Sequence, residues 1–405
     1  MGGLKISIYS KFKKYIKITF ILFFLNFENI TIESESKIYI SAKSAVLICA
    51  DSGDIVWEKN PHMHLPMAST TKIMTSIISL QHIEANGNQS IEIKQDMINV
   101  EGSSMGLKVG DVLNLLQLVI GMMLPSGNDA ANTAAICISG NKDEFVNLMN
   151  SKAEDIGMKD TCFFTPSGLD HGDHHSSAYD MAILGAYAMK NKKFAEIVQK
   201  RKETIFLNNV LWNNHRRLFL RNHNKLLNIY EYCLGIKTGY TKRAGRCLVS
   251  YAKKDNVELV ATTLDAPNDW MDHIMLYEYG FKNVINKKFD EKKMRINVKV
   301  VGGTLENLSC IVSTSFSKNF KLDIKDSEIS KKIILPEKIG APVTKGQLIG
   351  KIIYYHDDNV IGENLITASS NIPKSKKANF WRKIKESLTN FWYKITNFWY
   401  KIKIF

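Results

Sequence analysis

Residues 65–75 of the chain read Leu-Pro-Met-Ala-Ser-Thr-Thr-Lys-Ile-Met-Thr. Apolar residues then recur at helical spacing, at Ile73, Ile77 and Leu80. This pattern predicts a helix over residues 69–83, with Ser69 at its N-terminus. Residues three apart share one face of a helix, so the amine of Lys72 can reach the hydroxyl of Ser69. The stretch therefore places a serine and a lysine side by side.

This pair is a candidate nucleophile and base. A serine hydroxyl is a poor nucleophile and needs a positioned base to take its proton. Lys72 can act as that base only if its pKa falls, which burial beside a second cation would bring about. The candidate for the second cation is Lys237, which lies in a motif far along the chain.

Two further short motifs follow in order, Ser126-Gly127-Asn128 and Lys237-Thr238-Gly239. In the first, Ser126 can relay a proton to a leaving amine, and Asn128 offers a donor and an acceptor to a substrate amide. Each motif alone is ordinary, since such residues often cap helices or form turns. The three motifs in this order indicate a serine acyl-transfer site.

The last motif is predicted to lie on a strand, residues 234–238, that binds the substrate. Lys237 supplies positive charge for a substrate carboxylate, which Thr238 can also hydrogen-bond. Gly239 and Tyr240 continue this strand. The backbone amides of Ser69 and Tyr240 are candidates for an oxyanion hole, where one donor contributes roughly 3 kcal/mol.

With these motifs the chain resembles the low-molecular-mass penicillin-binding proteins, the serine-type D-alanyl-D-alanine carboxypeptidases, from about Ser44 to the C-terminal helix. The similarity lies in residues 65–75, 123–131, 164–170, 177–182 and 235–241. The resemblance implies an exported enzyme that removes the terminal D-alanine of peptidoglycan stem peptides through an acyl-Ser69 intermediate. It also implies inhibition by β-lactam antibiotics, and no cofactor is expected.

In one place the chain departs from the family pattern. Members often carry an arginine after the last strand of the catalytic sheet that helps to hold the substrate carboxylate. Residues 264–270 read Leu-Asp-Ala-Pro-Asn-Asp-Trp and contain no arginine. Carboxylate binding then falls more heavily on Lys237 and Thr238, with Arg243 or Arg246 as candidate helpers.

The order of predicted elements indicates an α+β fold. An early hairpin (residues 39–50 and 55–58) and late strands (247–252 and 258–264) form an antiparallel sheet. Between and after them come helices predicted over residues 112–123, 129–139, 143–156 and 270–279. The resemblance implies a penicillin-binding-protein or β-lactamase-like catalytic domain, residues 37–287. Residues 288–372 alternate in short runs that predict a small β domain, which the resemblance implies is a β-sandwich.

The two ends of the chain indicate export and a membrane surface. The formal net charge is +14, and the basic residues gather near both ends beside apolar ones. This favours an anionic membrane over nucleic acid as a partner. The apolar run 18–27, within a lysine-rich segment 1–36, is half the length of a spanning helix. It predicts a secretory signal, with an uncleaved signal anchor as the alternative.

Residues 373–405 repeat an Asn-Phe-Trp pattern that predicts an amphipathic helix. Between Lys374 and Lys403, nine Lys or Arg residues accompany a single acid, Glu386. A helix with a basic face and an aromatic apolar face is typical of the membrane interface. We therefore expect a protein held at the periplasmic face of the bacterial inner membrane; a coiled-coil or core-docking helix is the alternative.

A metal site is the main rival among the candidate sites. Asp170, His171, Asp173, His174 and His175 form a dense cluster that could bind zinc. Its spacing matches no strong metal motif, so we expect solvated loop residues and no metal. The six cysteines lie far apart and include no Cys-x-x-Cys pair.

Two other functions remain open from the sequence. A β-lactamase shares the three motifs, but it must hydrolyse its acyl-enzyme rapidly, commonly with a well-placed glutamate. The loop 166–179 contains no glutamate. The other alternative is a catalytically idle, membrane-bound protein that binds the cell wall, which the intact motifs disfavour.

Overall fold

The structure is a computed structural model, and it describes residues 38–402. The predicted signal segment, residues 1–36, lies outside the described residues. The catalytic part contains a five-stranded antiparallel sheet in the order β2-β1-β9-β8-β7. Its strands are β1 (Ser44–Cys49), β2 (Ile55–Lys59), β7 (Cys233–Thr241), β8 (Gly245–Lys254) and β9 (Val257–Leu264). The prediction of an antiparallel sheet built from early and late segments is confirmed.

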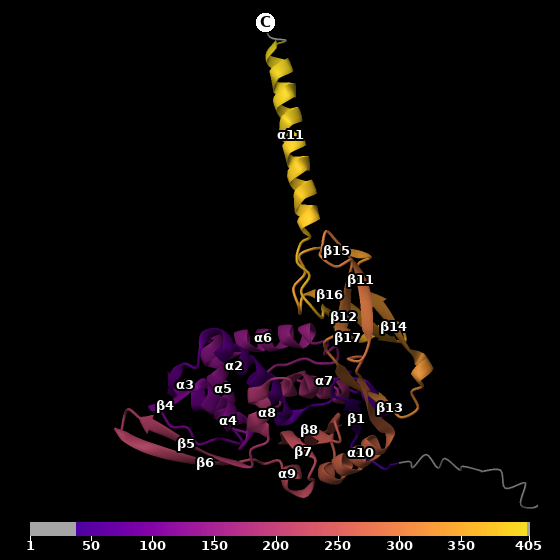
Figure 1. Cartoon of the computed structure of the whole chain (residues 1–405). Coiled ribbons are helices and arrows are strands. Elements are labelled where there is room, and N and C mark those ends of the chain that lie inside the picture. The colour runs from indigo at the N-terminus through magenta and orange to yellow at the C-terminus, as the bar shows by residue number, and fades with distance from the viewer. Residues whose placement is uncertain (1–37, 403–405) are drawn as a thin grey trace, which may run out of the picture. The chain divides into compact units, whose positions relative to one another are not determined.

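Helices cover both faces of this sheet (Figure 1). A Cβ on Gly185 of α7 (Ala178–Met189) would lie 2.9 Å from Val249 of β8. The neighbouring Ser250 hydrogen-bonds His273 of α10 (Asp269–Asn283) at 2.6 Å. Successive strand residues point to opposite faces, so α7 and α10 pack against opposite sides of the sheet.

The remaining helices form a layer beyond α7 that carries the first two motifs. They are η1 (Ala68–Thr71), α2 (Lys72–Asn86), α3 (Gln95–Ile98), α4 (Leu115–Met123), α5 (Asn128–Ser139), α6 (Lys142–Asp155) and α8 (Lys192–Val198). Most of the large core lies between these helices and the sheet. The helices predicted at 129–139 and 143–156 correspond to α5 and α6 within one residue at either end.

Two helix starts differ from prediction. The helix expected over 69–83 begins as the 3-10 turn η1 and becomes α-helical only at Lys72. The helix expected from Val112 begins at Leu115, because residues 111–114 form strand β4 (Asp111–Asn114). Asn114 caps this helix reciprocally with Gln117, at 2.9 and 2.8 Å, which fixes the start three residues later.

A second sheet, which the sequence analysis did not predict, flanks the helical layer. It has the order β3-β4-β5-β6, with β3 (Ser90–Glu92) and the long antiparallel hairpin of β5 (Lys202–Asn209) and β6 (Asn214–Arg221). After β6 the short helix α9 (Leu226–Ile229) leads into β7. The chain thus passes directly from the hairpin to the strand that carries the third motif.

The C-terminal part is mostly β, as predicted. Its strands are β10 (Val284–Phe289), β11 (Arg295–Val301), β12 (Asn307–Val312), β13 (Phe316–Lys321), β14 (Ile329–Ile334), β15 (Lys338–Gly340), β16 (Leu348–His356) and β17 (Asn359–Ala368), with the turn η2 (Asp326–Glu328). They form one six-stranded and one two-stranded sheet around a core of their own. The final helix is α11 (Lys376–Ile402). Within residues 38–402, no helix is long and apolar enough to cross a membrane.

Candidate active site

Ser69 lies in η1, immediately before α2, and its hydroxyl faces the amine of Lys72. The distance between Ser69 Oγ and Lys72 Nζ is 2.9 Å. Ser69 is half-buried, whereas Lys72 is fully buried. The predicted pair is therefore brought together, with the nucleophile open to solvent and the amine closed off from it.

The partners of Lys72 define what its amine can do. Besides Ser69, Nζ donates to Asn128 Oδ1 at 2.7 Å and to the Ser167 carbonyl at 2.6 Å. Burial, and then the charge of Lys237, hold the pKa of Lys72 well below its usual value of 10.5. A neutral amine has two N–H bonds and one lone pair. With both N–H groups on oxygens that only accept, the lone pair is left for the proton of Ser69.

The second motif sits between α4 and α5 and faces the same space. Ser126 is held at φ 65°, an unusual backbone conformation for a serine, of the kind found at functional sites. Its neighbour Asn128 is buried and also donates through Nδ2 to the Glu101 carbonyl at 2.6 Å. Asn128 therefore ties Lys72 to the loop before β4.

That loop brings a third serine, Ser103, to the site. The Ser103 carbonyl accepts from the Asn128 backbone N–H at 2.7 Å. The buried carboxylate of Asp129 accepts from the backbone of Met105, Gly106 and Leu107 at 2.9 to 3.1 Å. The sequence analysis missed Ser103, because its position depends on this long-range carboxylate anchor.

The third motif lies on β7, the edge strand of the large sheet. Lys237 is 1% exposed and donates to the Thr238 carbonyl at 2.9 Å, and burial lowers the pKa of Lys237 to about 7. Thr238 is half-buried, and Tyr240 is 67% exposed. Successive side chains of the strand alternate in direction, so Thr238 and Tyr240 reach the solvent-exposed side of β7 and Lys237 lies on the buried side.

Gly239 is the point at which β7 touches the nucleophile's turn. A Cβ there would lie 3.0 Å from both the Met67 carbonyl oxygen and the Ser69 amide nitrogen. Any side chain would push the strand away from Ser69. The motif's glycine thus allows the backbones of β7 and η1 to approach closely.

We expect Gly239→Ala to lower the rate of acylation of Ser69 by roughly tenfold, because the turn that holds Ser69 must shift by a few tenths of an ångström to make room for the methyl group. Gly340→Ala in β15 is the matched control, since a Cβ there has no atom within 4 Å. The rate of covalent labelling by a β-lactam measures both. Equal rates for the two variants would contradict the role given to Gly239.

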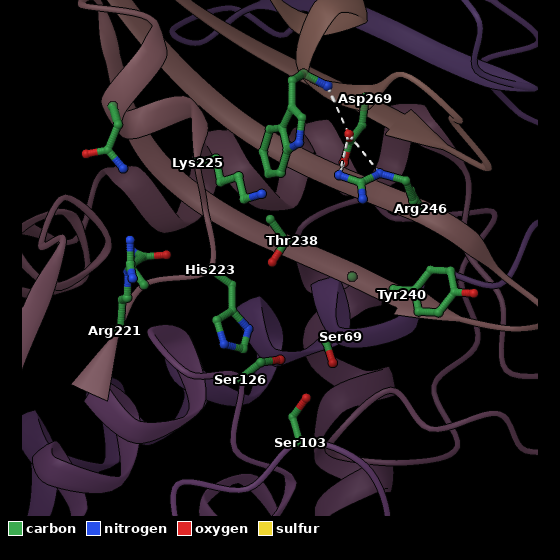
Figure 2. Close-up of a pocket in the computed structure, with 14 residues that line it drawn as sticks. Ser69, Ser103, Ser126, Arg221, His223, Lys225, Thr238, Tyr240, Arg246 and Asp269 are labelled. Carbon is green, nitrogen blue, oxygen red and sulfur yellow. Dashed lines mark hydrogen bonds and ion pairs between the residues drawn. The ribbon is translucent and has the colours of Figure 1, made fainter. Parts of the chain in front are cut away.

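The three motifs converge on one cleft of about 710 Å³. Ser69, Ser126, Thr238, Gly239 and Tyr240 line it, while Lys72, Asn128 and Lys237 are buried beside it. Figure 2 shows the hydroxyls of Ser69, Ser126 and Ser103 turned toward a common space. The cleft also has lining residues that the sequence analysis did not select: Ser103, Arg221, Asn222, His223, Lys225, Asn228, Asp269 and Trp270.

Of the two candidate helper arginines, only Arg246 lines the cleft. Its guanidinium binds the Asp269 carboxylate at 2.7 to 2.9 Å (Figure 2). The guanidinium also lies over the ring of Trp270, 5.3 Å from the ring centroid. Arg243 instead donates to the Gly172 carbonyl at 3.1 Å. Arg246 is therefore the arginine that β8 places near Thr238.

The expectation of a wholly solvated histidine cluster is wrong for His174, which is 2% exposed. His174 Nδ1 accepts from the Phe164 amide at 2.9 Å, and Nε2 lies 2.9 Å from Thr71 Oγ1. Burial lowers the pKa of His174 to about 4, so the ring is neutral at pH 7. Thr71 in turn donates to the Ala68 carbonyl at 2.8 Å. His174 therefore supports the turn that holds Ser69.

No group of metal-binding side chains is present among residues 38–402. Within this part of the chain, His174 uses both ring nitrogens in hydrogen bonds to protein groups. His175 Nδ1 lies 2.5 Å from the Asp173 carbonyl. The contacts of these rings are those of a folded loop.

Comparisons with known proteins agree with this geometry. Residues 31–268 match the family model of D-alanyl-D-alanine carboxypeptidases, and residues 286–374 match that of the penicillin-binding protein 5 C-terminal domain. The carboxypeptidase DacF of Bacillus subtilis is 29% identical over 363 residues, covering 88% of this chain and 92% of the relative. DacB2 of Mycobacterium tuberculosis is 31% identical over 248 residues, covering 59% of this chain and 82% of the relative.

A solved structure extends the likeness to both parts of the chain. Penicillin-binding protein 5 from Haemophilus influenzae is 28% identical and superposes with a TM-score of 0.62, covering 83% of this chain and 99% of that one. The α+β fold with a β-rich C-terminal domain is confirmed, as is the resemblance drawn from the motifs. The chain belongs to the D-alanyl-D-alanine carboxypeptidase family of serine enzymes.

Proposed function

We propose that this D-alanyl-D-alanine carboxypeptidase removes the terminal D-alanine of peptidoglycan stem peptides through an acyl-Ser69 intermediate. One observation carries the assignment of Ser69. Its Oγ lies 2.9 Å from a fully buried amine of depressed pKa and opens onto a cleft. A buried neutral amine beside an accessible hydroxyl is the arrangement that activates a serine.

Acylation follows from these positions. Ser69 Oγ attacks the carbonyl carbon of the penultimate D-alanine, and its proton passes to the lone pair of Lys72 Nζ. The negative charge that develops on the carbonyl oxygen is stabilised by the backbone amides of Ser69 and Tyr240, at roughly 3 kcal/mol per donor. The closeness of Gly239 to the Ser69 amide supports this pairing, because it brings β7 next to η1.

The intermediate then collapses with loss of the terminal amine. Ser126 carries a proton from the Lys72 ammonium to the leaving nitrogen, which departs as free D-alanine. Water then attacks the acyl-Ser69 ester; Lys72 takes a proton from the water and returns it to Ser69 Oγ as the ester bond breaks, which releases the shortened peptide and restores the enzyme. Asn128 holds Lys72 in place and offers its remaining polar capacity to the substrate amide.

The free carboxylate of the substrate meets the β7 side of the cleft. We assign its binding to the hydroxyl of Thr238 and the charge of Lys237; Arg246 lies in the same wall with its charge paired to Asp269. A carboxylate beside Lys237 raises the pKa of that lysine above about 7, because an opposite charge favours the charged form. Substrate binding thus preserves the cation that attracts it.

β-Lactams should acylate Ser69, and the resulting acyl-enzyme should hydrolyse slowly. No glutamate is among the residues that line the described cleft, and its single lining carboxylate, Asp269, is bound by Arg246. This composition gives no support to a β-lactamase, which needs a group to activate the deacylating water. The buried Lys72 and paired Ser69 likewise give no support to an idle wall-binding protein.

The test is release of D-alanine from a pentapeptide ending in D-Ala-D-Ala, with and without penicillin. We expect release that penicillin stops, together with covalent labelling of the protein. Rapid turnover of penicillin with no peptide cleavage would instead favour a β-lactamase. Labelling without release of D-alanine would favour a transpeptidase or binding role.

We also propose that the enzyme is exported and held at the periplasmic face of the inner membrane by α11. Large apolar side chains are exposed along this helix, at Phe380, Leu388, Phe391, Trp392 and Tyr393. The helix also carries lysines and few acids. Such a helix binds an anionic membrane surface without spanning it.

We expect deletion of residues 379–405 to release the protein from anionic lipid vesicles, with roughly hundredfold weaker binding, because the aromatic and basic groups are lost together. Penicillin labelling of the shortened protein is the control for an intact active site. Sedimentation with vesicles reads out binding. Unchanged sedimentation would move the anchor to another segment of the chain.

A further inference from the structure

The outer face of the β5–β6 hairpin is aromatic and exposed. On its inner face Ile205, Leu207 and Leu220 are 3 to 4% exposed and belong to the main core. On the outer face Phe206 is 67% exposed and Phe219 is 76% exposed. Thr204 pairs with Phe219, which makes the two phenylalanines diagonal neighbours across the strands. Folding of the core does not account for two large rings held in solvent.

The same face is basic. Lys202 stands directly opposite Arg221, and Arg217 stands opposite Phe206. None of these three cations forms an ion pair with a residue in the described part of the chain, whereas Arg216 on the inner face pairs with buried Asp111. Like charges directly opposite each other are destabilising in a sheet. An anionic group bound over this face would relieve the repulsion between Lys202 and Arg221.

This face leads into the active-site cleft. Arg221 ends β6 and lines the cleft together with His223 and Lys225 (Figure 2). Across the cleft, Asp269 is the only acid among the described lining residues, and Arg246 neutralises it. A ligand with its reactive end at Ser69 therefore meets Lys225 and Arg221 in the cleft wall, and Lys202 stands directly opposite Arg221.

We propose that the outer face of the hairpin binds the polymer to which the scissile peptide is attached, the glycan strand with its neighbouring acidic peptides. This inference rests on the proposed function. The apolar C–H faces of sugar rings stack on aromatic rings such as Phe206 and Phe219. Peptide carboxylates along the polymer are attracted to Lys202, Arg217 and Arg221. The surface thus selects polymeric substrate over a free peptide.

A membrane surface is the occupant that the observations favour less. The hairpin tip does expose Val210, Leu211 and Trp212. The rings of Phe206 and Phe219, however, lie along the strands on the face that continues into the cleft, where a substrate chain must pass. Continuity with the catalytic cleft points to the substrate polymer.

The test compares two triple variants of the full chain. One is Phe206→Ser, Arg217→Gln, Phe219→Ser, none of which lines the cleft. The matched control is Val301→Ser, Leu305→Ser, Lys299→Gln, which removes two exposed apolar side chains and one exposed cation from the small β domain. Each is assayed for co-sedimentation with purified insoluble peptidoglycan and with anionic lipid vesicles, and for D-alanine release from the polymer and from a short peptide.

We expect the hairpin variant to lose roughly tenfold in binding to the polymer and in kcat/KM for it, while the control matches the wild type. For the short peptide, kcat/KM should stay within about twofold in both. Unchanged polymer binding, or an equal loss in the control, would overturn the proposal. So would a loss confined to anionic vesicles, which would assign the face to lipid.

The outcomes separate this proposal from the proposed function. If the wild type releases no D-alanine from either substrate, the catalytic assignment fails, and polymer binding by the two triple variants still tests the hairpin. Covalent labelling by penicillin shows that each variant has a folded active site.

Discussion

Replacement of Ser69 by alanine is expected to abolish covalent labelling by penicillin and to lower D-alanine release by at least about 10⁴-fold. Removal of a serine nucleophile has effects of this order in enzymes whose nucleophile and base act as a unit. The fold should survive the change. Among residues 38–402, Ser69 Oγ hydrogen-bonds only Lys72, whose amine keeps Asn128 and Ser167 as partners.

Ser103→Ala is the matched control for this experiment. Ser103 lines the same cleft, but its hydroxyl is not among the hydrogen-bond partners of the buried amines of Lys72 and Lys237. We expect it to label with penicillin within tenfold of the wild-type rate. Mass spectrometry of the labelled protein locates the adduct. An adduct on Ser103 or Ser126, or labelling of the Ser69→Ala protein, would refute the assignment.

The parts of the site that could be predicted are those that local spacing determines. Ser69 and Lys72 are one helical turn apart. The Lys237 motif lies in a segment whose residue types predict a strand. The helices over α5 and α6 carry clear apolar periodicity. In each case the residues that decide the structure are neighbours in the chain.

The parts that could not be predicted depend on distant partners. Residues 112–114 were expected to be helical, but they belong to β4, which pairs with β3 and with β5, nearly 100 residues away. His174 was expected in solvent, but it is buried against Thr71, 103 residues away. Arg221 and Lys225 line the cleft only because the fold brings the segment that follows β6 close to Ser69 and β7. A single sequence contains no direct record of such pairings.

Lys72→Met should lower the rate of acylation by penicillin by about 10³-fold, because a positioned general base contributes 10²- to 10⁴-fold. The methionine side chain is unbranched and only one atom shorter than that of lysine, but it has no lone pair of comparable basicity. It also leaves Asn128 Oδ1 and the Ser167 carbonyl without their donor, so the variant should melt at a lower temperature. Lys142→Met, at the exposed start of α6, is the control and should keep both the rate and the melting temperature.

The pH dependence of acylation tests the role of Lys72 as the base without replacing Lys72 itself. The base must be neutral, so acylation rises with pH through the depressed pKa of Lys72. Burial is the larger cause of that depression and the charge of Lys237 is the second. Lys237→Met removes the repulsion but not the burial. The pKa of Lys72 should therefore rise, and the acid limb of the acylation profile should move to higher pH.

The alkaline limb has the opposite sign and a different origin. Lys237, with its pKa at about 7 in the free site, loses its charge as the pH rises, and the attraction for a substrate carboxylate weakens. In the wild type, kcat/KM should therefore fall above neutral pH, and in Lys237→Met this fall should disappear while the whole profile lies lower. An acid limb that stays in place in Lys237→Met would show that the charge of Lys237 does not act on Lys72.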